Sequence, residues 1–513
     1  MTTPVSRHTL GDLLRRTRQR HPHKLAIRCG DTAWTYAAFD DTCNALANGL
    51  AGLGVAVGDR VAVMARNSHA FAALRFAVAR LGAVLVPINF MLSAEEANYI
   101  LTHSGATVLC TDSGFADLGR AASVGTAVRH AVWLPSEGPT EPAPGLTRFD
   151  DLLRPGPAPE RALDSRMLAQ IIYTSGTESR PKGAMLTHEA VIAEYVTCLV
   201  DAEIAEGDTL LHALPLYHCA QLDVFFGPSV YVGASNVITG TPTPDHLLRL
   251  LAEHRISSFF APPTVWIGLL RASAFDQTDL GALRKGYYGA SIMPVAVLHE
   301  MQQRLPKVRL WNLYGQTEIA PVATVLKPED QLRKAGSAGR AALNVETRVV
   351  NDAMQDVAPG EVGEIVHRSP QLLSGYYHDE ERTRAAFEGG WFHSGDLGVL
   401  DEEGYLTVVD RKKDMIKTGG ENVASREVEE AIYRVPAVSE VAVIGLPDPK
   451  WVEAVTAVIV VKAGHTLTET EVLAALEGHL AHFKQPKRIL FTDALPKNPS
   501  GKLLKRELRL RYA

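Results

Sequence analysis

The chain has 513 residues, of which 46% are hydrophobic and 21% charged, and its 52 Lys and Arg against 58 Asp and Glu give a net charge of −6. Single hydrophobic cores rarely grow beyond about 250–300 residues, so this length predicts at least two structural units. The charge balance, without a long block of Lys or Arg, argues against nucleic acid as a main partner.

The cysteines and the apolar segments bear on the compartment. The cysteines lie far apart and form no Cys-x-x-Cys pair, so neither a disulfide framework nor a thiolate zinc site is indicated, and we expect buried thiols in a reducing compartment. The N-terminus lacks the apolar core of a signal peptide, and Arg80 and Pro87 interrupt the apolar stretch at residues 76–92. We therefore expect a cytoplasmic protein with no transmembrane segment.

The first predicted elements alternate between strand and helix. Short β-branched runs predict strands at residues 60–64, 83–87 and 107–110, and the pattern at 93–101 predicts a helix. This alternation is typical of parallel strands joined by crossover helices. The proline-rich segment 135–160 is predicted to be a surface connection, which leads to a strand at 167–173.

The last hundred residues show a different, compact pattern. A strand predicted at 404–410 runs into a charged segment, and beyond it we predict a helix at 425–433, strands at 441–444 and 455–461, and a helix opened by the capping box of Thr468 and Glu471. We therefore predict an α/β protein with a large N-terminal domain of layered α/β subdomains, residues 1–411, and a small α+β C-terminal domain, residues 412–513.

The loop from Tyr173 to His188 has the composition of a phosphate-binding loop. Its Gly, Ser and Thr residues offer backbone N–H groups and hydroxyls, and Arg180 and Lys182 add positive charge. It lacks the spacing of a Walker P-loop, and if it stood alone an ordinary polar turn would be the favoured explanation.

Four later motifs accompany this loop in order: Tyr314–Glu318, Trp391–Asp396, Asp410–Asn422 and Pro496–Lys502. The ordered set, from about Leu13 to about Leu508, closely resembles the adenylate-forming superfamily of acyl-CoA synthetases, peptide-synthetase adenylation domains and firefly luciferase, and is closest in pattern to fatty acyl-CoA synthetases. The resemblance implies two steps. A carboxylate attacks the α-phosphate of MgATP to give an acyl-adenylate and pyrophosphate, and a thiol then displaces AMP.

The resemblance also implies roles in the first step. Thr317 would touch the α-phosphate, Glu318 and Thr177 would hold Mg²⁺, and Lys502 would bridge the carboxylate and the α-phosphate. Asp396 would accept the ribose hydroxyls, and Arg411 would also contact the ribose. The other implied ATP contacts are the loop residues Thr174, Ser175, Gly176, Thr177, Glu178 and Lys182, and the residues around adenine, Gly289, Ala290, Ser291, Tyr314, Gly315 and Gln316.

In the second step, the C-terminal domain of the family rotates about a hinge at the position of Lys413. Gly419, Gly420 and Glu421 would then face the site, where glycines let the pantetheine arm of CoA pass close to the backbone. His218 is a candidate for gating or positioning only, and no general base is assigned. Each residue also has a structural explanation: a core histidine for His218, a helix-start charge for Glu318, a strand-end cap for Asp396 and a solvated lysine for Lys502.

The acyl pocket is implied by resemblance to fatty acyl-CoA synthetases and includes Leu222, Val224, Phe260 and Pro263. Its apolar wall favours a medium- or long-chain fatty acid, with an aryl acid as the alternative. An amino acid is disfavoured, because His218 stands where peptide-synthetase domains place an Asp. Loading of a carrier protein is less favoured than free CoA, because the chain lacks the insertion usual in acyl-AMP ligases. An ATP-binding module without catalysis and a homodimer remain open.

Glu178 and Ser179 depart from the family pattern, which mostly has Thr-Gly at the tip of the loop. An unpaired carboxylate facing triphosphate would be repelled by a few kcal/mol at an effective dielectric near about 20. We therefore hypothesise that Glu178 pairs with Arg180 or a neighbouring cation, or meets Mg²⁺ through water.

Overall fold

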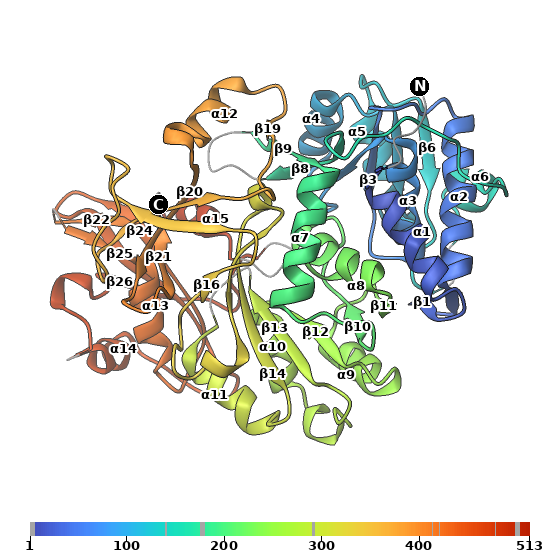
Figure 1. Cartoon of the computed structure of the whole chain (residues 1–513). Helices are drawn as coiled ribbons and strands as arrows, with labels where there is room; N and C mark the ends of the chain where they lie inside the picture. The colour runs from blue at the N-terminus through green and yellow to red at the C-terminus, as the bar shows by residue number, and fades with distance from the viewer. Residues whose placement is uncertain are drawn as a thin grey trace.

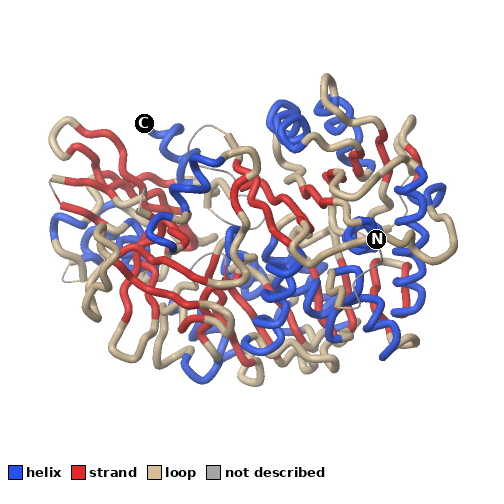
Figure 2. Tube along the Cα trace, turned by 45° about the horizontal axis from the view of Figure 1, so that its top comes forward, coloured by secondary structure: helices blue, strands red, loops and turns tan. Residues whose placement is uncertain are grey.

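The computed structural model in Figure 1 describes residues 6–138, 141–174, 180–289, 293–412, 414–419, 421–477, 479–497 and 503–513. Within these residues, three sheets build the larger N-terminal part, and a fourth sheet with its helices builds a smaller C-terminal part. The strands of the C-terminal part lie together at one end of the molecule in Figures 1 and 2. The predicted α/β fold with a small C-terminal unit is confirmed.

The first sheet delivers the glycine-rich loop. In spatial order its strands are β19 (Gly375–Tyr376), β9 (Lys182–Thr187), β8 (Leu168–Thr174), β4 (Val84–Pro87), β3 (Arg60–Met64), β5 (Val108–Thr111), β6 (His130–Trp133) and β7 (Thr147–Arg148). The pairs from β8 to β7 are parallel, as the alternating pattern predicts, while β9 and β19 run antiparallel at one edge. The helix predicted at 93–101 is α4 (Ala94–Ser104). It begins at the capping box of Ser93 and Glu96 and is followed by Gly105, where φ is +64°.

The second sheet carries most of the remaining N-terminal strands. In spatial order they are β16 (Arg340–Ala341), β15 (Val322–Leu326), β14 (Arg309–Gly315), β13 (Lys285–Gly289), β12 (Ser258–Phe260), β10 (Thr209–His212), β11 (Ser235–Ile238), β1 (Leu25–Cys29) and β2 (Thr32–Thr35). The strands β12, β13 and β14 are parallel neighbours. Their carboxyl ends therefore meet at one edge, the usual place for a ligand site in such sheets.

The third and fourth sheets lie on either side of the predicted boundary. The third consists of β17 (Glu346–Val350), β18 (Gly363–Arg368), β20 (Phe392–Leu400) and β21 (Leu406–Arg411). The fourth consists of β23 (Glu421–Val423), β22 (Ile416–Thr418), β25 (Val452–Val461), β24 (Val438–Asp448) and β26 (Arg488–Phe491). The strands β24 and β25, with 11 and 10 residues, extend beyond their predicted ranges because an antiparallel pair continues past the apolar runs.

The helices cover these sheets. They are α1 (Leu10–Arg20), α2 (Tyr36–Gly52), α3 (His69–Leu81), α4 (Ala94–Ser104), α5 (Ala116–Ser123), α6 (Phe149–Leu152), α7 (His188–Asp201), α8 (Gly227–Val232), α9 (Pro244–Glu253), α10 (Pro263–Arg271), α11 (Val295–Arg304), α12 (Glu380–Ala386), α13 (Ser425–Tyr433), α14 (Glu469–Leu476) and α15 (Lys505–Tyr512). The predicted helix at 425–433 and the capping box that opens α14 are confirmed. The proline-rich segment contains only the short β7 and α6 among its described residues.

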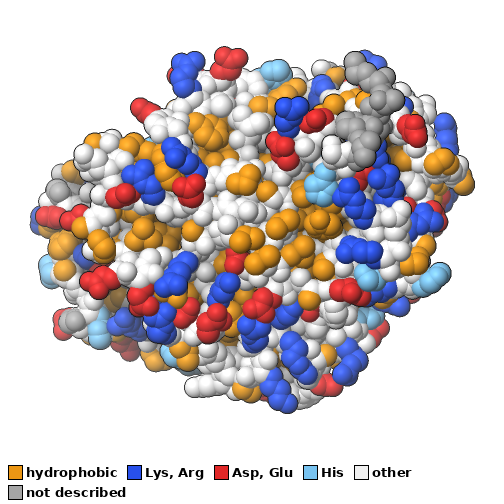
Figure 3. Space-filling view, in the orientation of Figure 1, with side chains coloured by type: hydrophobic (Ala, Val, Ile, Leu, Met, Phe, Trp, Pro, Cys, Tyr) orange, Lys and Arg blue, Asp and Glu red, His pale blue; other side chains and the backbone are white. Residues whose placement is uncertain are grey.

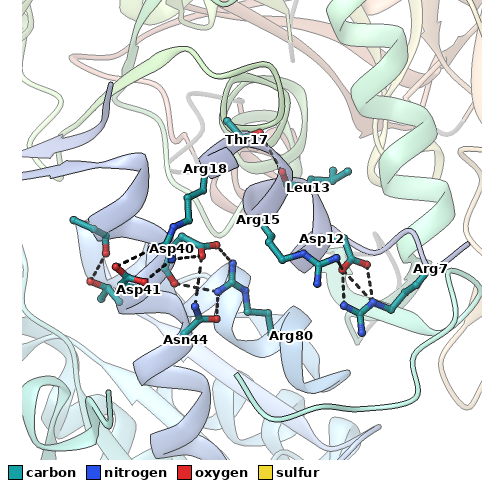
Figure 4. A network of polar contacts seen from close by, with 12 residues as sticks. Arg7, Asp12, Leu13, Arg15, Thr17, Arg18, Asp40, Asp41, Asn44 and Arg80 are labelled. Atoms are coloured by element: carbon teal, nitrogen blue, oxygen red, sulfur yellow. Dashed lines mark hydrogen bonds and ion pairs between the residues drawn. The ribbon is translucent and has the colours of Figure 1, made fainter. Parts of the chain in front are cut away.

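A charged network holds the first three helices together (Figure 4). Asp40 on α2 accepts from Arg80 on α3 and, at 2.9 Å, from Arg18 on α1. Asp40 and Arg80 are largely buried, at 3% and 7% side-chain exposure, and burial strengthens such a pair relative to a surface ion pair. The network therefore links α1, α2 and α3, of which α2 contacts β1 and β2 of the second sheet and α3 contacts both β1 and, in the first sheet, β4.

The charged side chains on the surface and the state of the cysteines match what the sequence predicts. On the face shown in Figure 3, acidic and basic side chains are interspersed. All five cysteines are buried and unpaired, as expected. None of the helices in the described part of the chain has the length and apolar character needed to cross a membrane.

Four buried histidines predict a loss of stability in weak acid. Burial lowers the pKa to about 3 for His188 and to about 4 for His69, His212 and His367. In the unfolded chain these histidines have pKa values near 6.5, so they bind protons there that they do not bind in the folded chain. The free energy of unfolding therefore falls as pH drops from 6.5 towards 4. Each histidine lowers the free energy of unfolding by about 1.4 kcal/mol per pH unit in this pH range. Urea unfolding from about pH 7 to about pH 5 measures this, and constant stability would contradict it.

Candidate active site

Three predicted ATP contacts meet where β14 faces β20 and β21. Asp396 and Arg411 are paired residues on adjacent antiparallel strands, and Arg411 Nε lies 3.6 Å from Asp396 Oδ1. The Tyr314 hydroxyl donates to Asp396 Oδ2 at 2.7 Å. Burial, together with the Asp396 charge, raises the pKa of Tyr314 well above its ordinary value, so the hydroxyl stays a donor. The carboxylate is thus fixed, and its remaining lone pairs can accept ligand hydroxyls.

A second group links the glycine-rich loop to the metal ligand implied by the sequence. Lys182 Nζ lies 3.2 Å from the Tyr376 hydroxyl and 4.3 Å from the centre of its ring. The same hydroxyl donates to Glu318 Oε1 at 3.0 Å. Burial raises the pKa of Tyr376, so this hydroxyl also stays neutral. A cation and a carboxylate from distant parts of the chain are therefore held on two sides of one phenol.

Thr317 and Glu318 lie on a short helical turn, η4 (Thr317–Ile319), which ends at Ala320 with φ of +67°. The turn is anchored from outside, because Leu373 N–H donates to the Glu318 carbonyl at 2.8 Å. Thr317 Oγ1 lies 3.2 Å from Cys219 Sγ, and Ala220 N–H donates to His218 Nδ1 at 3.1 Å. His218 is thus next in sequence to a residue that touches Thr317, and its Nδ1 is an acceptor rather than a protonated nitrogen. Burial raises the pKa of Cys219, which argues against a thiolate there.

Of the residues expected around adenine, the described ones lie at the carboxyl ends of β13 and β14 or directly after them: Gly289, Tyr314, Gly315 and Gln316. A Cβ atom on Gly289 would overlap the Leu313 carbonyl oxygen, and one on Gly315 would overlap the Pro321 carbonyl oxygen. Only glycine permits this close backbone approach. Gln316 Nε2 donates to the Ser394 carbonyl at 3.4 Å, which ties this edge to the strand of Asp396.

The region expected to meet CoA lies where β22 ends and β23 begins, at the antiparallel pair of Thr418 and Glu421. Gly419 has φ of +60°, and its N–H donates to the Trp451 carbonyl at 2.8 Å. The ammonium groups of Lys450 and Lys487 lie 4.7 and 5.4 Å from the Trp451 ring centre. Glu421 is exposed at the start of β23. An aromatic face with two cations beside a glycine turn offers complementary chemistry to a phosphorylated nucleotide.

The proposed acyl residues are buried, but they belong to different parts of the core. Leu222 and Val224 lie on η2 (Ala220–Phe226), a π-helical segment. Val224 and Phe260 belong to the same hydrophobic cluster as Phe225. The rings of Phe225 and Phe260 are stacked, with 4.4 Å between their centres. Leu222 packs in a separate cluster with Phe226, and Pro263 begins α10.

Several predicted residues lie outside the described part of the chain, and their roles stay predictions: Ser175, Gly176, Thr177, Glu178, Ser179, Ala290, Ser291, Lys413, Gly420 and Lys502. At the edges of the loop, Thr174 Oγ1 is buried without a hydrogen-bond partner among the described residues. The guanidinium carbon of Arg180 lies 5.2 Å from the centre of the Tyr99 ring. The proposed pairing of Glu178 with Arg180 remains a hypothesis.

The donors present suit Mg²⁺ bound together with a substrate. Among the described residues, no group of three or more His, Cys, Asp or Glu side chains could hold a metal by itself. Glu318 supplies a carboxylate, which is a hard oxygen donor, and the other implied ligand, Thr177, lies outside the described residues. Mg²⁺ typically binds one or two carboxylates plus the phosphates of its substrate, so Glu318 fits it.

Sequence reasoning did not identify Tyr376, Trp451 or Gln371. The aromatic pair Tyr376-Tyr377 and the pair Lys450-Trp451 are visible in the sequence. Their importance depends on tertiary contacts with Glu318 and Gly419, which no local pattern records.

Known proteins resemble this chain over nearly its whole length. Residues 14–377 match the family model of AMP-binding enzymes, and residues 427–502 match that of the AMP-binding enzyme C-terminal domain. The chain is 37% identical to a feruloyl-CoA synthase of an Amycolatopsis species, and the matched region covers 98% of this chain and 99% of the relative. It is also 37% identical to a long-chain-fatty-acid–CoA ligase of Mycobacterium tuberculosis, over 94% of each chain.

A solved structure has the same overall fold. An anthranilate CoA ligase in complex with anthranoyl-AMP superimposes with a TM-score of 0.91 and 27% identity, over 98% of this chain and 97% of the other. The similarity extends over both the large and the small part of the chain.

Proposed function

The chain belongs to the AMP-binding enzyme family and is an AMP-forming acyl-CoA synthetase, and on that premise we propose how its residues divide the work and which acid it activates. ATP and CoA are its substrates in this reaction class. This assignment replaces the alternative of an ATP-binding module without catalysis.

In the first step, a carboxylate oxygen of the acid attacks the α-phosphorus of ATP, the bond to the bridging oxygen breaks, and pyrophosphate leaves. The proposal rests on one observation above all: Tyr314 and Arg411 fix the Asp396 carboxylate, which would take the ribose hydroxyls. Lys182, Thr174 and the rest of the loop at 174–183 would neutralise the phosphates, and Thr317 would contact the α-phosphate. Mg²⁺, held by Glu318 and Thr177, would screen the phosphate charge.

In the second step, the CoA thiol adds to the adenylate carbonyl, the bond from carbonyl carbon to phosphate oxygen breaks, and AMP leaves. We place the domain boundary between residues 411 and 412 and propose that residues 412–513 rotate about Lys413 to bring Gly419–Glu421 to the site. Asp410 Oδ2 accepts from both Ser425 N–H and Ser425 Oγ at 2.7 Å, so these hydrogen bonds cross the proposed boundary and would have to break when the C-terminal part rotates.

We propose a medium- or long-chain fatty acid as the preferred substrate. The side chains assigned to the pocket are apolar, and each buried CH₂ contributes about 0.8 kcal/mol. The ligase of Mycobacterium tuberculosis acts on such acids by name. An aryl acid is the second candidate. The stacked pair Phe225–Phe260 offers flat surfaces for a ring, and the feruloyl-CoA synthase is an equally similar relative.

A substrate panel separates the two. Acids from butanoate to octadecanoate, with benzoate, cinnamate, ferulate and a dicarboxylate, are supplied with ATP, Mg²⁺ and CoA, and AMP and thioester are quantified. We expect kcat/KM to rise with aliphatic chain length. Turnover of aryl acids alone would overturn the fatty-acid proposal while leaving the reaction class intact.

Tyr314→Phe tests the ribose site. Removing the hydroxyl leaves the buried Asp396 carboxylate with one donor fewer, and a hydrogen bond to a charged group contributes about 1.5–3 kcal/mol. We expect KM for ATP to rise about tenfold or more with little change in KM for the acid. Tyr288→Phe, which removes a buried hydroxyl bonded to Gln331 instead, is the matched control. Equal kinetics for the two variants would contradict the assignment.

A further inference from the structure

A buried polar network lies directly behind the turn that carries Glu318. Glu194 on α7 and Gln371, in the segment before β19, both have 0% exposure. Gln371 Nε2 donates to Glu194 Oε2 at 2.6 Å, and Thr197 Oγ1 donates to Gln371 Oε1 at 2.6 Å. Every heteroatom of the Gln371 amide is therefore engaged inside the core.

The network is hydrogen-bonded to the backbone just after Glu318. Gln371 Nε2 also lies within donating distance of the carbonyls of Ile319, at 3.3 Å, and Val322, at 3.0 Å. Glu194 Oε1 accepts from Val322 N–H at 3.2 Å. The amide and the carboxylate thus bind both ends of the short segment from 319 to 322, whose first residue, Ile319, belongs to the Glu318 turn.

The same stretch of chain also holds Glu318 itself. Two residues after Gln371, Leu373 N–H donates to the Glu318 carbonyl at 2.8 Å, and five residues after it the Tyr376 hydroxyl donates to Glu318 Oε1 at 3.0 Å. The segment 371–376 therefore fixes the turn through a buried side chain, a backbone amide and a phenol. A shift of Gln371 would move all three.

Polar groups in a core cost free energy that apolar groups of the same shape do not. Burial raises the pKa of Glu194 well above its ordinary value, which reflects this cost. Buried networks are, however, well suited to fix one geometry, since each hydrogen bond constrains direction as well as distance. A network that meets the backbone beside the implied metal ligand is placed to fix that ligand.

We propose that Gln371 and Glu194 are positioning residues that hold the Glu318 carboxylate in the orientation that binds Mg²⁺ with ATP. This inference rests on the proposed role of Glu318. Neither residue touches the substrates; both act through the backbone from Ile319 to Val322. Loosening them would impair the use of the metal more than the binding of the nucleotide alone.

The test measures ATP binding by calorimetry, with and without Mg²⁺, for four proteins: the parent, Gln371→Met, Glu318→Gln and Gln331→Met. Methionine keeps the shape of glutamine but cannot donate. Gln331 is a matched control, because it is also buried, donates to the Leu326 carbonyl and accepts from a hydroxyl, but has no contact with the Glu318 turn among the described residues.

For Gln371→Met we expect the gain in ATP affinity caused by Mg²⁺ to fall about tenfold, with ATP binding in the absence of Mg²⁺ changed less than about twofold. The Mg²⁺ concentration for half-maximal rate should rise, and excess Mg²⁺ should restore part of kcat. Gln331→Met should match the parent in each respect.

The outcomes distinguish the inference from its premise. If Glu318→Gln leaves the effect of Mg²⁺ unchanged, the role of Glu318 is wrong, and the inference falls with it. If Glu318→Gln loses the effect but Gln371→Met retains it, only the positioning role is overturned. Should Gln371→Met not fold, Glu194→Gln carries the same test, because the two Glu194 oxygens accept from Gln371 Nε2 and from Val322 N–H, so the new amide nitrogen would face a donor in either orientation; an unchanged effect of Mg²⁺ there also overturns the proposal.

Discussion

Lys502→Ala is expected to lower acyl-adenylate formation by about 10²–10³-fold while leaving the conversion of supplied acyl-adenylate to thioester within a few-fold of the parent. In the first step two anions meet, and a mobile ammonium that bridges the carboxylate and the α-phosphate offsets their repulsion as charge shifts between them. In the second step the attacking group is a thiol, and the domain rotation would have carried Lys502 away from the site.

The two half-reactions are measured separately, by acid-dependent exchange of pyrophosphate into ATP and by thioester formation from synthetic acyl-adenylate and CoA. Lys497→Ala is the control, since Lys497 lies in the same motif but pairs with Glu440 at 2.6 Å. Lys497→Ala should retain both half-reactions. An equal loss of both in Lys502→Ala would contradict the proposed division of labour.

Arg75→Met is expected to lower the free energy of unfolding by about 3–5 kcal/mol, because it leaves a buried charge without its partner. Arg75 Nη2 and Asp223 Oδ1 lie 3.0 Å apart at 1% and 0% side-chain exposure. Gln170 and Tyr195 also donate to Asp223, at 2.7 and 3.2 Å, but neither supplies positive charge. Burial raises the pKa of Asp223 despite these partners, which shows how poorly solvated the carboxylate is.

The same variant should also disturb acyl binding, because Asp223 lies on the π-helical segment between Leu222 and Val224. Urea unfolding measures the first effect, and KM for the acid measures the second. The double variant Arg75→Met with Asp223→Asn removes both charges and should recover much of the stability. A stability of Arg75→Met within about 1 kcal/mol of the parent would show that the ion pair is not needed.

The sequence predicts the elements whose pattern is local. The strands β3, β4 and β5 are short β-branched runs, and α13 and α14 carry regular helical spacing, so all five appear near their predicted positions. The ends of β24 and β25 were less well predicted, because the length of an antiparallel pair is set by the partner strand rather than by its own apolar residues.

The site residues also fall into those that a sequence motif predicts and those whose role depends on tertiary contacts. Asp396, Arg411 and Glu318 are visible because they belong to motifs with a fixed order. The Tyr314–Asp396 hydrogen bond depends on how β14 faces the third sheet, and the contacts of Gln371 and Tyr376 with the Glu318 turn join residues more than fifty positions apart. Such pairings arise from tertiary packing, which neither periodicity nor motif spacing contains.

The most direct test of the two-step reaction follows the oxygen atoms of the acid. The purified enzyme is given ATP, Mg²⁺, CoA and an acid labelled with heavy oxygen in its carboxylate, and the products are analysed by mass spectrometry. Attack on the α-phosphorus predicts one labelled oxygen in the phosphate of AMP and unlabelled pyrophosphate, with the other label retained in the thioester carbonyl. Labelled inorganic phosphate with ADP would instead mean attack at the γ-phosphorus and would contradict an acyl-adenylate.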